Sequence, residues 1–138
     1  MVEISITQAT LTEIDRLAVL NKYLIEDEGH PNTMNVPQLA ERMTGWLQGE
    51  YSGYLARRDD RIAAYCLFRD DGDYYYLRQL YVDRDFRRQG IATQLLDWMY
   101  ANVWTEKKVR LDVLAHNEGA IAFYRHYGFK TQVLRLEK

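Results

Sequence analysis

One short stretch combines two arginines with a glycine at the joint between two regular patterns. Residues 87–92 read RRQGIA, after an apolar and aromatic run, YYYLRQLYV, and before a helical pattern, TQLLDWMYANV. The first N–H groups of a helix lack backbone partners and carry partial positive charge, so such a joint attracts anions. It can therefore hold a phosphate group. The alternative is that Gly90 only eases a turn while both arginines are solvated, because short glycine patterns also occur by chance.

A second cluster of charge lies in the stretch EDEGHPN. Glu26, Asp27 and Glu28 concentrate negative charge there, which can attract a cationic amine. The alternative is a solvated helix end. The three histidines of the chain are scattered and not paired at ligand spacings, so we expect no metal site.

The phosphate loop does not fit the nucleotide-binding P-loop pattern. RRQGIATQ lacks the Gly-Lys-Ser/Thr end that holds phosphates and magnesium in that motif. The single cysteine, Cys66, lies in the apolar run IAAYCLF, where a buried and inert thiol is expected. One cysteine excludes an internal disulfide, which favours a reducing cytoplasm.

Length and charge narrow the class of protein. A chain of 138 residues is expected to form one domain, residues 1–138, around a single core. Its 18 basic and 20 acidic residues give a net charge of −2, so we expect neither nucleic acid nor an anionic membrane as a partner. The N-terminus lacks the pattern of a signal peptide, and no window resembles a membrane span. We therefore expect a cytoplasmic protein.

The first half of the chain alternates between strand and helix patterns. Residues 2–8 alternate apolar and polar side chains like a half-exposed strand. A helix is predicted over residues 10–26, where Thr10 and Glu13 form a capping box. A second helix, at residues 36–48, is opened by Asn35 and Pro37. Three strand-like runs then follow at residues 51–58, 61–70 and 74–83.

The second half supplies a crossover. A helix over residues 90–103 leads to a strand at 109–115, then to a helix at 116–129 with Asn117 near its N-cap and Gly128 at its end, and to a closing strand at 131–137. This order predicts an α/β domain with a mixed, mostly antiparallel sheet, helices on both faces and one βαβ crossover. The RRQGIA loop would follow the carboxyl end of a strand, where open sheets bind ligands.

Two blocks of sequence resemble the GCN5-related N-acetyltransferase (GNAT) family. The first is the LYV run at residues 80–82, followed by the Arg-x-x-Gly-x-Ala pattern at residues 87–92. The second is Asn117 with the AIAFY…YGF pattern at residues 120–129, which follows the run VRLDVLA. The blocks occur in the order and on the element types that the family uses, and the resemblance extends over nearly the whole chain.

The resemblance implies acetyl-CoA as the acyl donor and a primary amine as the acceptor. Backbone N–H groups of residues 88–93 would hold the pyrophosphate, and backbone groups at residues 80–82 would pair with pantetheine in a gap beside the strand, often with a bulge. The cofactor-binding residues that it implies are Leu80, Tyr81, Val82, Arg87, Arg88, Gln89, Gly90, Ile91, Ala92, Thr93, Asn117 and Tyr124.

The same resemblance assigns the general acid but leaves the base open. Tyr124 matches the family tyrosine that protonates the departing thiolate. Many relatives carry a carboxylate on the strand before the phosphate loop, whereas YYYLRQLY offers only Arg78 and Gln79 as polar side chains. The candidate bases are Glu28, His30, Asp112 or a chain of water, and the candidate acceptor-binding residues are Glu28, His30 and Gln79.

Two functions are compatible with this sequence. The first is an acetyl-CoA-dependent N-acetyltransferase that acts by direct amine attack in a ternary complex. The second is a non-catalytic acyl-CoA-binding module or sensor that kept the cofactor groove, which the missing strand carboxylate favours. Aromatic strands near the C-terminal edge also leave a homodimer open.

Overall fold

The computed structural model describes residues 2–138 and has an α/β fold with a single five-stranded sheet. The strands follow one another across the sheet in chain order, and every neighbouring pair is antiparallel except the last, which is parallel. Their bounds are β1 Ser5–Gln8, β2 Tyr51–Arg58, β3 Arg61–Asp70, β4 Tyr75–Val82 and β5 Val109–Arg110. The predicted mixed and mostly antiparallel sheet is thus confirmed.

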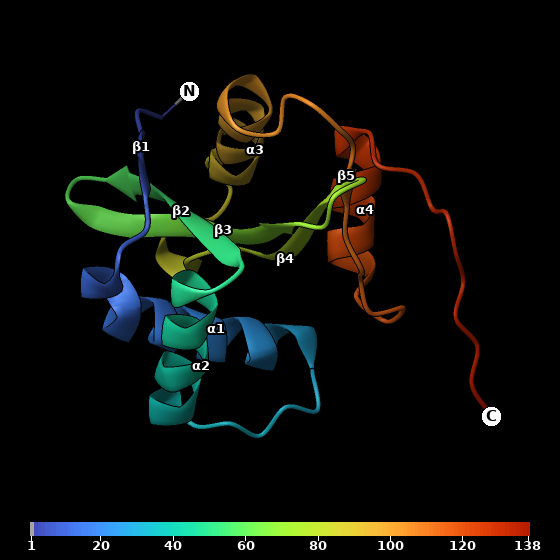
Figure 1. Cartoon of the computed structure of the whole chain (residues 1–138), viewed down its shortest axis with the longest axis horizontal. Coiled ribbons are helices and arrows are strands. Elements are labelled where there is room, and N and C mark those ends of the chain that lie inside the picture. The colour runs from blue at the N-terminus through green and yellow to red at the C-terminus, as the bar shows by residue number, and fades with distance from the viewer. Residues whose placement is uncertain (1) are drawn as a thin grey trace.

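Four helices cover the two faces of this sheet. Helices α1 (Ile14–Glu28) and α2 (Val36–Gln48) lie below it in Figure 1, and α3 (Ile91–Asn102) lies above it. Helix α4 (Glu118–Tyr127) packs into the same core cluster as α3. Because α3 connects the parallel strands β4 and β5, the predicted βαβ crossover is also confirmed. None of these helices is long and apolar enough to cross a bilayer.

Each face of the sheet has its own core. On the α3 side, Leu95 and Met99 pack with Phe68 and Trp104. On the α1 and α2 side, Leu17, Leu20, Met43, Leu55 and Tyr65 form a second cluster. Each fully buried large apolar side chain contributes about 1.5–3 kcal/mol relative to exposure, so the two cores hold the sheet as a rigid support for the site.

Local capping signals fix where the helices begin. The capping box of Thr10 and Glu13 is present and opens the 3-10 turn Leu11–Glu13, which continues into α1. Asn35 caps α2 together with Gln38, and both hydrogen bonds of this second capping box measure 2.9 Å. At α4, the Asn117 side chain accepts a 3.3 Å hydrogen bond from the Ala120 N–H. These predictions of the sequence are confirmed.

A β-bulge in β4 interrupts the regular alternation of its side chains between the two faces of the sheet. Phe68 of β3 pairs with Leu77 and Leu67 pairs with Gln79, so Arg78 is one extra residue on β4. Before the bulge, Tyr75 and Leu77 belong to the core on the α3 side. After it, Leu80 and Val82 pack against that core, whereas Tyr81 joins the core on the α1 side. Arg78 and Gln79 therefore follow each other toward the face of α1 and α2.

Two strands predicted near the end of the chain differ from the structure. One is shorter than predicted, and the other is not formed. The strand expected over residues 109–115 pairs only through Val109 and Arg110, because the chain then turns away from β4. Residues 131–137 form no strand, since β5 leaves no long edge for them to join. Instead, Val133, Leu134 and Leu136 are at least 80% exposed.

Candidate active site

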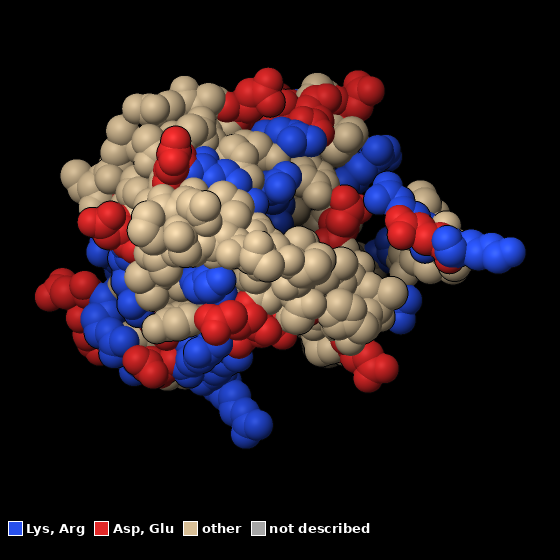
Figure 2. Space-filling model, turned by 90° about the horizontal axis from the view of Figure 1, so that it is seen from below, with Lys and Arg blue, Asp and Glu red and all other residues tan. Residues whose placement is uncertain are grey.

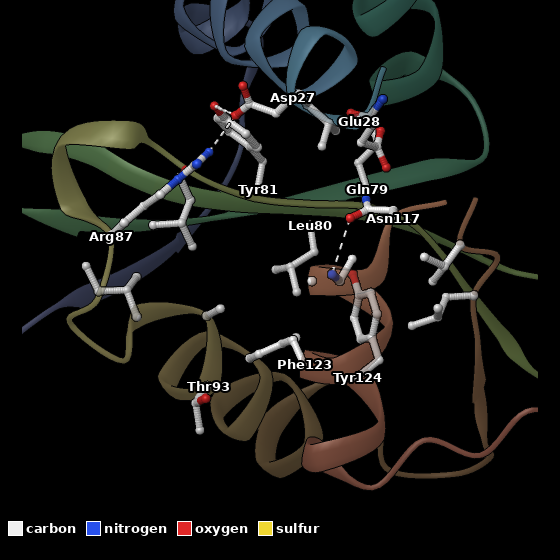
Figure 3. A pocket seen from close by; sticks show the side chains of 18 of the residues that line it. Asp27, Glu28, Gln79, Leu80, Tyr81, Arg87, Thr93, Asn117, Phe123 and Tyr124 are labelled. Carbon is white, nitrogen blue, oxygen red and sulfur yellow. Dashed lines mark hydrogen bonds and ion pairs between the residues drawn. The ribbon is translucent and has the colours of Figure 1, made fainter. Parts of the chain in front are cut away.

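A cavity opens where β4 and β5 diverge. It has a volume of about 840 Å³ and is lined by the end of α1, by β4, by the loop before α3 and by α4 (Figure 3). Strand β5 pairs with β4 only at Tyr75 and Tyr76, so residues 77–82 have no strand partner on that side. Such a free edge offers backbone N–H and C=O groups to an extended ligand.

The start of α3 supplies free hydrogen-bond donors to this cavity. Gly90 is the N-cap, and no side chain caps the helix. The first bond of the helix runs from the Gln94 N–H to the Gly90 carbonyl at 3.1 Å, so the N–H groups of residues 91–93 have no partner within the helix. Ile91, Ala92 and Thr93 all line the cavity. Their N–H groups and the helix dipole make this end suited to an anion.

The loop before α3 needs glycine for its backbone conformation. Gly90 has φ of +74°, and Arg88 also adopts a positive φ, of +61°. A Cβ built on Gly90 would meet no atom within 4 Å, so no protein group crowds this position. The left-handed conformation is costly for residues other than glycine, which explains Gly90 without any ligand. The open space in front of it remains accessible to one.

Arg87 is turned toward α1 and away from the helix start. Its Nη2 lies 2.6 Å from Asp27 Oδ2, and its Nε donates to the Val82 carbonyl at 3.3 Å. Asp27 also accepts a bond from Arg84 at 2.7 Å. A further bond to Asp27 comes from the Tyr81 hydroxyl at 2.9 Å (Figure 3). Burial opposes the charge of Asp27, but the bonds from Arg84, Arg87 and Tyr81 outweigh it and hold its pKa below the usual value. The carboxylate therefore ties α1 to the loop.

Replacing Asp27 by asparagine should lower the free energy of unfolding by about 1 kcal/mol at pH 7. Hydrogen bonds to a charged group contribute more than this, but the partners are partly exposed and screened. Because the pKa of Asp27 is lowered by folding, its contribution is present above the unfolded value of about 3.9 and is lost as the pH falls through the lower folded value. Urea unfolding of both proteins at pH 7 and pH 3 measures the difference.

The matched control for this measurement is Asp85→Asn. Asp85 also pairs with an arginine, Arg61, at 2.8 Å, but its side chain is 65% exposed. Its loss should therefore change stability by less than half of the Asp27 effect. An Asp27→Asn effect of equal size at both pH values would contradict the role of the ionised carboxylate.

Tyr124 and Glu28 face the cavity from opposite sides. Figure 3 shows the Tyr124 hydroxyl on α4 pointing toward the sheet, with Glu28 and Gln79 side by side above it. Burial, and then the nearby Glu28 carboxylate and Cys66 thiol, raise the pKa of the Tyr124 phenol. It thus stays protonated at neutral pH and can donate a proton.

Glu28 is a partly buried carboxyl whose surroundings disfavour its charged form. Burial raises the pKa of its carboxyl, the charges of His30 and His116 oppose this shift, and Asp27 adds to it. His116 lies 2.6 Å from the Glu28 backbone oxygen and so ties the end of α1 to the segment before α4. Asp112, which lines the cavity together with Asp27 and Glu28, accepts a bond from the Tyr76 hydroxyl at 2.9 Å.

The cavity gathers most of the residues singled out from the sequence. All of the implied cofactor-binding residues line it, as do Glu28, Gln79 and Asp112. His30 does not line it; its Nδ1 accepts a 3.1 Å bond from the Asn32 N–H. The sequence did not reveal the partnership of Asp27 with Tyr81 and Arg87, because these residues lie 54 and 60 positions away along the chain.

Comparison with known proteins gives the same family as the two sequence blocks at residues 80–92 and 117–129. The model of the Acetyltransferase (GNAT) family matches residues 11–129. The [ribosomal protein bS18]-alanine N-acetyltransferase of Salmonella typhimurium is 35% identical over 91 residues, which cover 64% of this chain and 62% of that protein. An N-alpha-acetyltransferase of Sulfurisphaera tokodaii is 28% identical over 96% of this chain and 84% of its own length. The chain thus spans less than two thirds of the first of these relatives.

Solved structures share the fold. A predicted acetyltransferase with acetyl-CoA from Clostridium acetobutylicum has a TM-score of 0.76 to this structure. It is 21% identical, and the match covers 99% of this chain and 96% of that one. At this identity the likeness establishes the arrangement of helices and strands.

Proposed function

Since the chain belongs to the acetyltransferase (GNAT) family, we propose that it transfers an acetyl group from acetyl-CoA to a primary amine of a small molecule or protein. The amine attacks the thioester directly while both substrates are bound. One observation carries this proposal: a single cavity joins the uncapped start of α3, the free edge of β4 and the Tyr124 phenol. These are an anion site, a surface for an extended chain and a proton donor.

The residues present fit acetyl-CoA. The free N–H groups of residues 91–93 would bind the pyrophosphate, and Arg88, exposed on the same loop, would add positive charge. Arg87 would support this loop through Asp27. The unpaired edge of β4 at residues 80–82 would pair with the pantetheine amides, as an added strand does. A solved neighbour with acetyl-CoA is consistent with this placement.

The chemistry needs a neutral amine, donors for the oxyanion that forms and a proton for the departing thiolate. A backbone N–H of the free β4 edge would stabilise the oxyanion, and Tyr124 would supply the proton. Glu28 would attract the cationic form of the amine and accept its proton directly or through water. Holding the two reactants in line supplies much of the acceleration, since oriented pairs reach effective molarities of roughly 10⁵ M or more.

Calorimetric titration of acetyl-CoA, free CoA and ATP tests the cofactor site. We expect acetyl-CoA and CoA to bind and ATP not to bind. Release of free thiol on addition of amines then separates an enzyme from a non-catalytic acyl-CoA-binding module, which would bind acetyl-CoA without turnover. Failure of both CoA forms to bind the folded protein would refute the proposal.

Glu28→Gln should lower kcat/KM for a protonated aliphatic amine by about tenfold, chiefly through KM, because the carboxylate attracts the ammonium group. A weakly basic amine that is neutral at pH 7 should be little affected. In the parent protein, kcat/KM for the cationic amine should rise as the pH passes the raised pKa of Glu28, and the variant should lack this rise. Steady-state thiol release over a range of pH measures both effects.

Glu26→Gln is the matched control, because it removes the same charge from an exposed position outside the cavity. It should leave both amines unaffected. Equal losses for the two amines in Glu28→Gln would assign Glu28 to proton transfer and exclude simple attraction.

A further inference from the structure

Two arginines on the face of α1 and α2 have no carboxylate partner. Arg42 of α2 and Arg78 of β4 take part in none of the ion pairs formed within residues 2–138. Arg69, on the neighbouring strand, is paired with Asp71 at 2.6 Å. The two unpaired guanidinium groups instead stack on Trp46, at 4.3 and 4.6 Å from the ring centre. They therefore share one aromatic support.

The arrangement is unfavourable without a ligand. Arg42 is partly buried, and its Nε has no hydrogen-bond partner. Its one bond, from Nη2 to Asn21 Oδ1, is 3.3 Å long. Burial and then the positive charge of Arg78 lower the pKa of Arg42. Both guanidinium carbons lie within 4.6 Å of one ring centre, which puts them inside the screening distance of about 10 Å in dilute salt. An anion bound next to these groups would offset this repulsion.

The bulge in β4 brings Arg78 to the cavity, whereas Arg42 stands beside it on Trp46 and does not itself line the cavity. As the extra residue of the strand, Arg78 projects to the same side as Gln79, and both line the cavity. Gln79 accepts a 2.8 Å bond from the buried Tyr65 hydroxyl. Burial and then Glu28 raise the pKa of Tyr65, whereas Arg42 acts in the opposite direction. The pair of Tyr65 and Gln79 thus lies near a negative group, Glu28, and a positive one, Arg42.

Basic and acidic side chains are not evenly mixed on the face of the protein that is seen from below. Figure 2 shows basic side chains gathered in the upper middle of the face seen from below, with acidic side chains toward the rim above them. The chain as a whole is slightly acidic, with a net charge of −2. A local basic site on such a protein selects an anionic group without attracting nucleic acid in general.

We propose that the acceptor carries a carboxylate as well as its amine, and that Arg78 binds this carboxylate at the cavity wall with the neighbouring Arg42 adding positive charge, while Glu28 and Tyr124 face the amine. This inference rests on the proposed acetyl transfer and names its substrate class. An amino acid, or a peptide with an acidic residue near its free N-terminus, has the required chemistry. A polyamine lacks it, because its second charged group would meet the guanidinium groups.

Acceptors in matched pairs test the proposal. The first pair is Ala-Glu-amide and Ala-Gln-amide, and the second is glutamate and its diamide; each pair differs in carboxylate charge. Thiol release should give the carboxylate member of at least one pair a kcat/KM higher by about tenfold or more. In Arg42→Gln and Arg78→Gln this preference should fall to about twofold or less, and the rate with the uncharged member should stay within about twofold.

Two further variants test whether the preference depends on the position and on the sign of the charge. Arg61→Gln is the matched control, since Arg61 also stacks on an aromatic ring, Phe86, but is paired with Asp85 and lies outside the cavity. It should keep the full preference. Arg78→Glu should reverse the preference, so that Ala-Lys-amide becomes a better acceptor than Ala-Glu-amide. Circular dichroism of each variant checks that it is folded.

Binding provides the readout that does not depend on turnover. In the CoA-saturated protein, titration of each peptide followed by tryptophan fluorescence should show tighter binding of Ala-Glu-amide than of Ala-Gln-amide. If neither turnover nor binding favours a carboxylate, or if the preference survives in both arginine variants, the proposal is overturned. Absence of acetyl-CoA binding is a different result, because it refutes the acetyl transfer itself.

Discussion

Gly90→Leu should weaken acetyl-CoA binding by at least about 100-fold while the domain stays folded. Gly90 has φ of +74° and stands directly before the free N–H groups of α3. A leucine side chain there meets no protein atom near its Cβ, so the fold loses only the cost of a left-handed residue, about 1–2 kcal/mol. The same side chain would occupy the space that a pyrophosphate needs. It would remove several charge-assisted bonds at once, which accounts for the size of the loss.

Calorimetric titration with acetyl-CoA measures this effect, and Gly72→Leu is its matched control. Gly72 also has a positive φ, of +90°, and a Cβ there likewise meets no atom within 4 Å. It does not line the cavity. Both variants should lose similar stability, and only Gly90→Leu should lose affinity. Unchanged affinity in Gly90→Leu would remove the start of α3 from the cofactor site.

Tyr124→Phe should lower kcat by about 100-fold or more and leave the affinity for acetyl-CoA within about twofold. The substitution keeps the ring, which packs on Phe123 and Phe129, and removes only the hydroxyl that points into the cavity. Because the pKa of the phenol is raised, the parent enzyme should not lose activity through ionisation of Tyr124 below about pH 10. Single-turnover thiol release and calorimetry separate chemistry from binding.

Tyr127→Phe is the control on the same helix. The Tyr127 hydroxyl donates a 2.7 Å bond to Asp97 and does not line the cavity. Its removal should affect stability and leave kcat nearly unchanged. Turnover of Tyr124→Phe equal to that of the parent would assign the proton transfer to water or to another group.

The sequence predicted those features of the fold that depend on neighbours along the chain. Capping residues such as Asn35 and Asn117 satisfy backbone groups within one turn, so their helices begin where the pattern indicates. The order of strands and helices also follows from local periodicity and gives the crossover through α3. The glycine and the helical pattern beside it located the start of α3, where the helix lacks a side-chain cap and lines the cavity.

Features that depend on distant partners could not be predicted in the same way. The run VRLDVLA has the alternation of a strand, but pairing also needs a neighbouring edge, and β4 supplies one only at Tyr75 and Tyr76. Residues 131–137, which follow Phe129, form no strand for the same reason. The bond of Arg87 to Asp27 joins segments 60 residues apart, so the sequence left Arg87 as a candidate for phosphate. Only the folded chain reveals that competing partner.

The bulge at Arg78 gives β4 the role of a partition between two compartments. Before Arg78, the odd-numbered side chains of β4 face the core on the α3 side. After it, the even-numbered side chains face that core, and the odd-numbered ones face the α1 side. Leu80 and Val82 are thereby directed to one compartment, while Gln79 and Tyr81 are directed to the other. The side of the sheet that each of these residues faces is therefore set by the number of residues in the strand as well as by their types. If Arg78 instead took a regular place in the ladder with β3, residues 79–82 would each move by one position and face the opposite compartment, even though every side chain that forms the walls would still be present.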